Sequence, residues 1–248
     1  GIAGQFRTPR HIIDMMVEIL DPNADERIAD PSVGTGGFLV QSIRHVMRRN
    51  TSEEGVIKEL TEDGETETEI YTGDLLSDAA RANLQNDFAN GFDFDATMLR
   101  LSAMNLFMHG VDTPHIYNQD SLSHDFAERH PKLESDAFDV VLANPPFNIS
   151  DWGGNRLRED VRWKYGIPPV GNANYAWLQH IIHHLAPNGT AGVVLSNSSM
   201  SSNSKGEGDV RKNLIENDLV DCMVSLPGNL FYGVTIPCCL WFLTKNKN

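Results

Sequence analysis

Four consecutive residues are the best candidates for chemistry: Asn144-Pro145-Pro146-Phe147, directly after the predicted buried strand Phe138–Ala143. Proline fixes φ, lacks an N–H and biases the residue before it to an extended backbone, so two in succession make a stiff corner. The Asn144 side-chain oxygen and the Pro145 carbonyl can then accept both hydrogens of one planar amino group, such as that of a nucleobase. This localises a lone pair that the ring otherwise delocalises, and the Phe147 ring can stack on an extruded base. The corner therefore predicts a site for an amino group, with a tight surface turn as the alternative.

A glycine-rich stretch, residues 30–37 (DPSVGTGG), falls where a predicted strand ends and a predicted helix begins. Glycines at such a turn let a ligand approach the backbone and meet N–H groups that the helix leaves unpaired. The dinucleotide fingerprint G-x-G-x-x-G would need glycine at position 39, where the chain has Leu39. A nicotinamide cofactor is therefore disfavoured.

Carboxylates follow the next two core strands. Asp93 and Asp95 come at the end of the first of these, where the ribose of a bound nucleoside would lie. We expect Asp93 to accept from the ribose hydroxyls and Asp95 to cap the following helix. Asp120, followed by Ser121, has the corresponding place after the next strand and can accept from an adenine amino group.

The wider pattern predicts alternating helices and strands. Thr8 and Pro9 predict a helix start, because a Thr hydroxyl caps free N–H groups and Pro fits the first turn. Strands are expected near Asp30 and at 91–94, 115–118, 138–143, 190–195, 220–226 and 236–243. Such alternation predicts a parallel sheet covered on both faces, with ligands at the carboxyl ends of its strands. The link 227–235 is too short for a helical crossover, so the last two strands should pair antiparallel.

The composition fits one α/β domain over residues 1–248. The formal charge of −14 disfavours simple nonspecific DNA binding, although residues 53–69 alone hold eight acidic residues against one Lys. We expect an acidic insertion loop at 51–72 and a mobile loop at the serine-rich stretch 196–204. The sequence has no stretch apolar enough for a membrane helix and no secretory signal, which predicts a cytoplasmic protein. It begins at Gly1 without Met, so we expect a piece of a longer chain.

Two further groups of side chains can be interpreted either as ordinary structural residues or as functional sites. Basic residues alternate with aromatic ones after the corner, at Trp152, Arg156, Arg158, Arg162, Trp163, Lys164 and Tyr165. This pattern is as compatible with nucleic-acid contact as with an ordinary solvated surface. His180, His183 and His184 share a predicted helix face, but the H-E-x-x-H pattern and a fourth ligand are missing, so no metal site is expected. The three cysteines lack C-x-x-C spacing and are expected to be buried free thiols.

Taken together, these motifs resemble those of the amino-type DNA adenine methyltransferases, specifically the modification subunit of type I restriction-modification systems. The resemblance covers nearly the whole chain. It rests on residues 4–10 (GQFRTPR), on the D-P-x-x-G-T-G-G-F-L loop from Asp30 to Leu39, on N-P-P-F, and on 104–106, 174–185 and 226–231. Their order is that of the gamma class. The chain departs from the family at Ser32-Val33 and at 198–204, where the family has small or sulfur-bearing residues and a more apolar segment, respectively.

The resemblance implies a Rossmann-like fold with a seven-stranded, mostly parallel sheet and an antiparallel final strand. It implies S-adenosylmethionine as cofactor and direct methyl transfer to an amino nitrogen without a metal. The residues it assigns to the cofactor are Gln5, Phe6, Arg7, Thr8, Pro9, Arg10, Asp30, Gly34, Thr35, Gly36, Gly37, Asp93, Asp120 and Ser121. Those it assigns to catalysis are Asn144, Pro145, Pro146 and Phe147.

The same resemblance implies partners: double-stranded DNA, a specificity subunit that recognises the target, a second modification subunit and, as a further partner, a restriction subunit. DNA affinity then need not reside in this acidic chain. Two alternatives stay open. One is a methyltransferase with the same core that acts on RNA or on a protein glutamine, although such enzymes usually have Tyr where this chain has Phe147. The other is a noncatalytic scaffold, which would be expected to lose Asn144 or the glycine loop.

Overall fold

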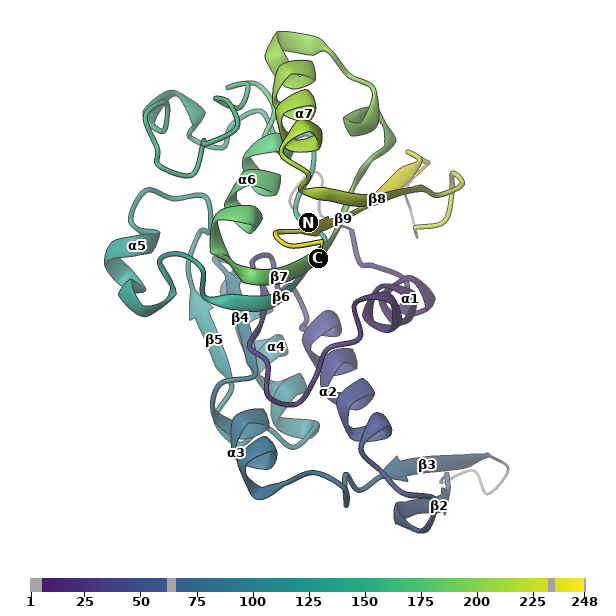
Figure 1. Ribbon diagram of the computed structural model, residues 1–248. Coiled ribbons are helices and arrows are strands. Elements are labelled where there is room, and N and C mark those ends of the chain that lie inside the picture. Colours follow the sequence, from purple (N-terminus) through teal and green to yellow (C-terminus); the bar gives the residue numbers. More distant parts are fainter. Residues whose placement is uncertain (1–5, 62–65, 232–234, 248) are drawn as a thin grey trace.

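A computed structural model describes residues 6–61, 66–231 and 235–247 (Figure 1). The helices are α1 (Arg10–Leu20), α2 (Gly37–Arg49), α3 (Asp78–Asn86), α4 (Ala96–Met108), α5 (Phe126–Arg129), α6 (Asn174–His184) and α7 (Glu207–Glu216). The strands are β1 (Ile28–Asp30), β2 (Val56–Leu60), β3 (Glu67–Tyr71), β4 (Ala89–Asp93), β5 (His115–Asn118), β6 (Phe138–Ala143), β7 (Leu185–Ser196), β8 (Val220–Ser225) and β9 (Cys238–Thr244).

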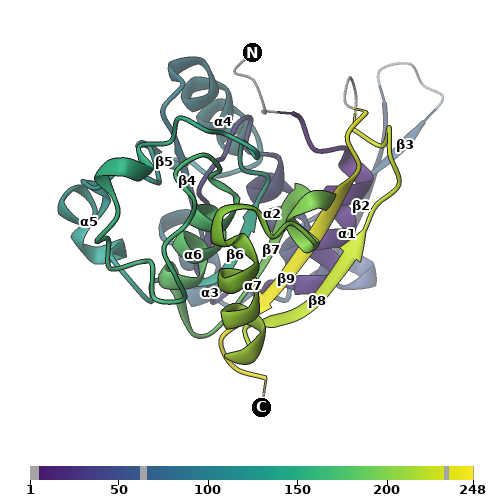
Figure 2. The ribbon, with the colours of Figure 1, turned by 90° about the horizontal axis from the view of Figure 1, so that it is seen from above.

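Seven of these strands form one sheet in the order β5-β4-β1-β6-β7-β9-β8, with β5 at one edge and β8 at the other (Figure 2). Neighbours from β5 to β7 pair in parallel, whereas β9 lies antiparallel between β7 and β8. The expected α/β class, with an antiparallel final strand, is confirmed. Strand order reverses between β1 and β6, and ligands of open α/β sheets bind outside the carboxyl ends at such a point.

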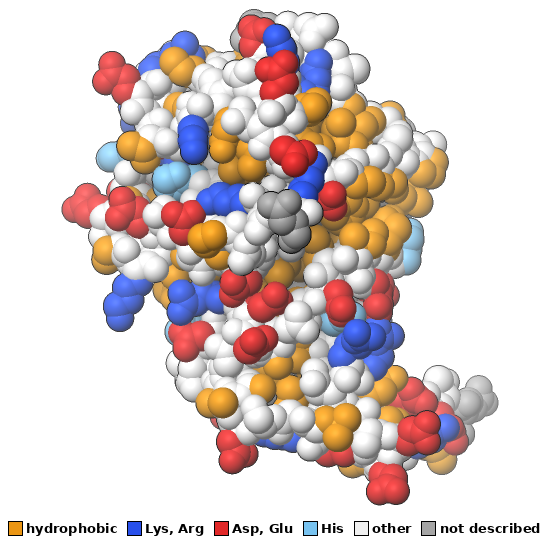
Figure 3. Space-filling view, viewed as in Figure 1, with side chains coloured by type: hydrophobic (Ala, Val, Ile, Leu, Met, Phe, Trp, Pro, Cys, Tyr) orange, Lys and Arg blue, Asp and Glu red, His pale blue; other side chains and the backbone are white. Residues whose placement is uncertain are grey.

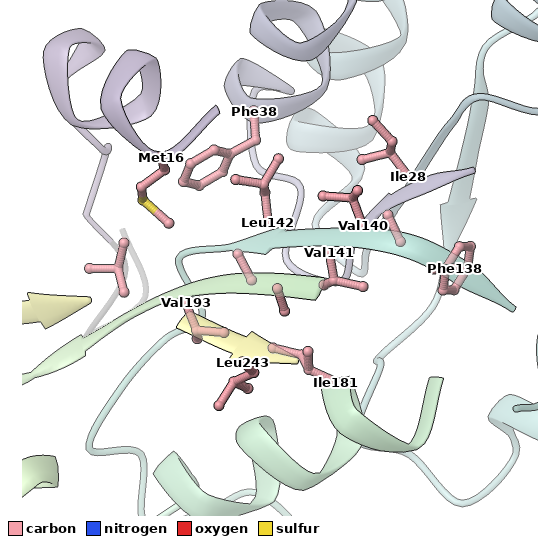
Figure 4. Close-up of a cluster of buried hydrophobic side chains, with 14 of the residues drawn as sticks. Met16, Ile28, Phe38, Phe138, Val140, Val141, Leu142, Ile181, Val193 and Leu243 are labelled. Carbon is pink, nitrogen blue, oxygen red and sulfur yellow. The ribbon is translucent and has the colours of Figure 1, made fainter. Parts of the chain in front are cut away.

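Helices cover both faces of the sheet. Helices α1, α2 and α4 pack together on one face, and α6 lies on the other beside α7 (Figure 1). Side chains alternate along a strand, so Leu142 of β6 points toward Met16 and Phe38 while Val141 points toward Ile181 (Figure 4). All five are at most 5% exposed. This two-sided burial explains why β6 is apolar at every position from Val140 to Ala143.

The start of α1 differs from the prediction. The helix begins at Arg10 after Pro9, and no side chain caps its first turn. The Thr8 hydroxyl instead accepts a hydrogen bond from the Asn144 side chain, 2.9 Å away. The expected apolar face is present, with Met16 and Val17 buried against the sheet.

The acidic insertion is not a loop but a β-hairpin. Strands β2 and β3 pair antiparallel from Val56–Tyr71 to Leu60–Glu67, and the hairpin projects from the body of the molecule (Figure 1). Figure 3 shows acidic side chains gathered on this projection. Its side chains are mostly exposed, so the prediction that the segment lies outside the core is confirmed.

The serine-rich segment is also more ordered than expected, because it contains 3-10 helices at Asn197–Met200 and Ser204–Gly206. Ser199 is 2% exposed, and its hydroxyl accepts from the Trp241 indole at 3.0 Å. Of the three cysteines, Cys238 and Cys239 are buried as expected, but Cys222 is exposed on the edge strand β8. Among the described residues, the helices are all too short or too polar to cross a membrane.

Candidate active site

The sheet places the predicted motifs side by side. Strands β5, β4, β1 and β6 are consecutive neighbours, and each motif follows the carboxyl end of one of them. Their order along the edge is Asp120-Ser121, Asp93, the glycine loop 30–37 and the corner at Asn144. A ligand along this edge would therefore meet the β5 loop at one end and the corner at the other.

The glycine loop and β4 share a pair of buried carboxylates. Asp93 accepts from the Gly34 N–H at 3.1 Å, and Asp30 accepts from the Ser32 N–H at 3.0 Å. Both side chains are under 5% exposed. Burial, reinforced by the charge of Asp93, raises the pKa of Asp30 to about 7. Two such groups at one edge are a candidate cation site, because a positive charge there would favour the ionised state of Asp30.

The loop requires two of its glycines. Gly34 and Gly36 have φ of 52° and 83°, the left-handed region that residues with a Cβ rarely adopt. A Cβ on Gly36 would also approach the Ser102 Cβ of α4 to 3.3 Å, whereas one on Gly34 would meet only the Ser32 carbonyl at 3.9 Å. The surface over Gly34 is therefore open to a ligand. With the two carboxylates, it fits a cofactor that joins a nucleoside to a cationic group.

Asn144 is oriented by the segment before α1. Its Nδ2 donates to the Phe6 carbonyl at 2.7 Å and to the Thr8 hydroxyl at 2.9 Å. A carbonyl oxygen only accepts, so the amide nitrogen must face Phe6. The Oδ1 atom points the other way, and no hydrogen bond to it is found among the described residues. The corner therefore presents an acceptor.

The residues after Asn144 are fixed more tightly than predicted. Phe147 is 3% exposed, and its ring lies 5.9 Å from that of Phe6. Its face is covered in this structure, so stacking on a base stays a prediction. Asn148 follows with φ of 59° and exchanges hydrogen bonds with Asn174 of α6: the Asn148 N–H donates at 2.9 Å and the Asn174 amide donates back at 3.0 Å.

Sequence reasoning missed this asparagine pair. A signal was present, since Asn tolerates the left-handed conformation better than most residues and follows the two prolines closely. The partner, 26 positions later, has no local signal.

The other predicted residues have varied surroundings. Asp95 caps α4 by accepting from the Thr97 and Met98 N–H groups, as expected. Asp120 is exposed and accepts from the Leu122 N–H, while the buried Ser121 hydroxyl donates to the Pro31 carbonyl at 2.6 Å. Arg7 and Arg10 are exposed, and Gln5 lies outside the described residues. The role of each toward a ligand stays a prediction.

Part of the basic and aromatic stretch is internal, which contradicts the nucleic-acid interpretation for two residues. Arg162 and Trp163 are 5% and 8% exposed and bind other parts of the chain. Only Arg156, Arg158 and Lys164 present exposed positive charge there.

His180 and His184 of α6 are also internal, whereas His183 is partly exposed. Among the residues that the structure describes, no group of three or more His, Cys, Asp or Glu side chains is arranged to hold a metal. Burial lowers the pKa of His184 to about 3. The adjoining cavity, about 10 Å³, has no room for more than a water molecule. A cleft of about 510 Å³ lies elsewhere, between α2 and the hairpin, and none of the predicted site residues lines it.

The sheet order is that of the class I S-adenosylmethionine-dependent methyltransferase fold. The chain belongs to the N-6 DNA Methylase family, whose model matches residues 1–248.

Named relatives agree with this assignment. The type I restriction enzyme HindI methylase subunit of Haemophilus influenzae is 39% identical over 246 residues, 99% of this chain and 47% of the relative. The MjaIX methylase subunit of Methanocaldococcus jannaschii is 38% identical over 253 residues, 99% of this chain and 38% of the relative. The chain thus spans half or less of these relatives. A type I methyltransferase subunit from Streptococcus thermophilus superposes with a TM-score of 0.75 at 24% identity, over all of this chain and 46% of that one, and supports the fold.

Proposed function

We propose that this chain is the catalytic domain of a DNA adenine N6-methyltransferase that uses S-adenosylmethionine. The observation that carries the proposal is the orientation of Asn144, whose amide nitrogen is held by Phe6 and Thr8 so that its oxygen faces outward. This acceptor follows β6, the strand beside the one that leads into the glycine loop. The corner and the cation site are therefore adjacent, as transfer between two bound molecules requires.

The chain's own residues would act by positioning. Asn144 Oδ1 and the Pro145 carbonyl would accept the two hydrogens of the adenine amino group and turn its nitrogen lone pair toward the glycine loop. Asp93 would hold the ribose, and Asp30 would face the positively charged half of the cofactor. When bound, S-adenosylmethionine supplies a methyl group on a sulfonium, which is electrophilic without further activation. Correct alignment of the two reactants accounts for most of the catalysis expected here.

We further propose that the chain works within a type I restriction-modification complex in the cytoplasm. The relatives are named type I restriction enzyme methylase subunits, and this chain's net charge of −14 is poorly suited to holding DNA alone. A specificity subunit would recognise the double-stranded site, a second modification subunit would complete the clamp, and a restriction subunit would join them. A methyltransferase acting on RNA or protein glutamine is the competing function.

The test is Asn144→Ala, with Asn86→Ala on the exposed side of α3 as the matched control. Calorimetry should show S-adenosylmethionine binding to both variants as to the unmodified chain. With a partner specificity subunit, methyl incorporation into DNA should fall roughly 100-fold or more for Asn144→Ala alone, since one preorganised hydrogen bond to the reacting group is lost. Full activity would exclude the proposed role of Asn144. Absence of cofactor binding in the unmodified chain would favour a scaffold, and incorporation only into RNA or protein would favour the competing function.

A further inference from the structure

A buried arginine joins the loop after the catalytic corner to the loop after β5. Arg162 belongs to residues 149–173, which follow the corner and precede α6. Its side chain is 5% exposed, which is unusual for arginine unless every donor is satisfied. The basic pattern of this stretch is compatible with contact to nucleic acid, but the Arg162 side chain is buried inside the protein.

Each N–H of the guanidinium has an acceptor. Nε and Nη2 donate to the two carboxylate oxygens of Asp160, at 2.8 and 2.7 Å. Nη1 donates to the Ser121 carbonyl at 2.9 Å, and Nη2 donates to the carbonyls of Leu122 at 2.8 Å and Ser123 at 3.3 Å. Three consecutive carbonyls of the β5 loop therefore converge on one cation.

The remaining donor reaches His180 of α6, whose Nδ1 lies 3.1 Å from Nη1. Arginine has no acceptor, so His180 Nδ1 must be unprotonated. Burial, together with the charges of His184 and Arg162, lowers the pKa of His180 well below its ordinary value, in agreement with a neutral ring. Burial alone would raise the pKa of Asp160, but the hydrogen bonds and charge of Arg162 outweigh it and hold that pKa below its ordinary value. The pair is ionised and complete.

The β5 loop is tied to the glycine loop as well. The Ser121 hydroxyl donates to the Pro31 carbonyl at 2.6 Å. Leu122 packs in a small apolar cluster with Leu157, Trp163 and Trp177, which belong to the stretch after the corner and to α6. The conformation of the β5 loop is thus fixed by hydrogen bonds to Arg162 and by the hydrogen bond to the glycine loop.

We infer that Arg162 is a positioning residue for the adenosine half of the cofactor. This inference rests on the proposed function and on the predicted contact between Asp120, in the loop after β5, and the adenine amino group of the cofactor. Arg162 touches neither substrate nor cofactor and acts by holding the backbone of Ser121, Leu122 and Ser123. Because it comes from the stretch after the corner, cofactor affinity depends on the folding of that stretch.

Binding measurements on the 248-residue chain separate this role from a merely structural one. We would compare Arg162→Met, Arg162→Lys and the surface control Arg49→Met, whose charge is 63% exposed at the end of α2. The ligands are S-adenosylmethionine and 5′-methylthioadenosine, which lacks the amino-acid part. Calorimetry is done well below each melting temperature, with circular dichroism confirming the fold.

Arg162→Met should weaken both ligands by the same factor, about ten-fold, because a β5 loop released by the arginine must be ordered again on binding, and fixing about one backbone residue costs roughly that factor. Arg162→Lys should weaken both less, since it keeps the charge but lacks the planar fork. Arg49→Met should bind both as the unmodified chain does. Asp30→Asn should weaken S-adenosylmethionine more than methylthioadenosine, which shows that the two ligands report on different halves of the site.

Three results would overturn the inference. The first is unchanged affinity for both ligands in a folded Arg162→Met or Arg162→Lys chain, which would make the arginine purely structural. The second is loss of S-adenosylmethionine binding alone, which would place the effect at the amino-acid half. If Arg162→Met does not fold, Asp160→Asn replaces it, and equal affinity in that variant would also refute the inference. Failure of the unmodified chain to bind either ligand would instead refute the proposed function on which the inference rests.

Discussion

The state of Asp30 makes cofactor binding depend on pH in a way that can be calculated. Its pKa is raised from 3.8 to about 7, chiefly by burial. At 1.36 kcal/mol per unit, ionising this carboxyl in the ligand-free pocket costs about 4 kcal/mol more than in water. A bound cation beside it would favour the ionised form and lower the pKa, so binding below pH 7 should release a proton.

The expected size follows from the ionised fraction. If only ionised Asp30 binds the cation, that fraction rises about 25-fold between pH 5.5 and 7.5 for a pKa of 7, and the association constant should rise by the same factor. Above pH 8 Asp30 is almost fully ionised, so its contribution to the affinity should no longer rise. Calorimetry in two buffers of different ionisation enthalpy would measure the released proton directly. The ligand's own amino group titrates near pH 8, so Asp30→Asn provides the reference, and its affinity should change much less below pH 7.

Stability should change in the opposite sense. Between pH 3.8 and about 7 the folded chain holds a proton on Asp30 that the unfolded chain has lost, so this group's contribution to stability falls as pH rises through that window. Asp30→Asn removes this pH dependence of stability. The melting temperature of the variant, relative to that of the unmodified chain, should therefore rise from pH 5 to pH 8. Affinity that is flat from pH 5.5 to 7.5 with no proton release, or an identical profile in Asp30→Asn, would refute the reasoning.

Two further substitutions test neighbouring parts of the site. Asp93→Ala should weaken S-adenosylmethionine by about 1–3 kcal/mol in calorimetry, whereas Asp95→Ala should lower stability by about 1 kcal/mol through loss of the α4 cap and leave affinity unchanged; the reverse pattern would exchange their roles. Asn174→Ala should reduce methyl transfer while leaving cofactor affinity intact, because it frees Asn148 from its left-handed conformation beside the corner. The control Asn188→Ala, at an exposed position, should transfer methyl groups as the unmodified chain does. Unaltered transfer in Asn174→Ala would show that the Asn148–Asn174 pair is dispensable.

The sheet could be predicted because its strands are buried on both faces. Runs such as Val140–Ala143 are apolar without alternation. The least accurate boundary is the start of β7, which lies at Leu185 and not at residue 190. Pro187 and Gly189, which lie between these two positions, indicate a turn. The strand nevertheless begins before them, because Leu185 pairs with Phe138 of β6, and the register shifts before the next pair, Val140 and Thr190.

The hairpin could not be predicted from composition because its stability is local and unrelated to the core. Ile57 faces Ile70 across the two strands although both are more than 40% exposed. Lys58 lies opposite Glu69 and 3.9 Å from the Glu67 carboxylate. Such cross-strand pairs stabilise a ribbon by fractions of a kcal/mol each. The excess of charge therefore predicted correctly that this segment is exposed to solvent, but the prediction that its backbone forms a loop was wrong.

The corner shows most clearly where a local motif stops being informative. The prolines predict the rigid turn, but nothing in N-P-P-F decides which end of the Asn144 amide faces outward. That choice is made by Phe6 and Thr8, which are 138 and 136 positions away. Local reasoning assigned the Thr8 hydroxyl to the helix that follows it, whereas the tertiary contact uses it as an acceptor. The outward-facing oxygen at Asn144 is thus a property of the fold, and the segment before α1 is as much part of the catalytic corner as the motif itself.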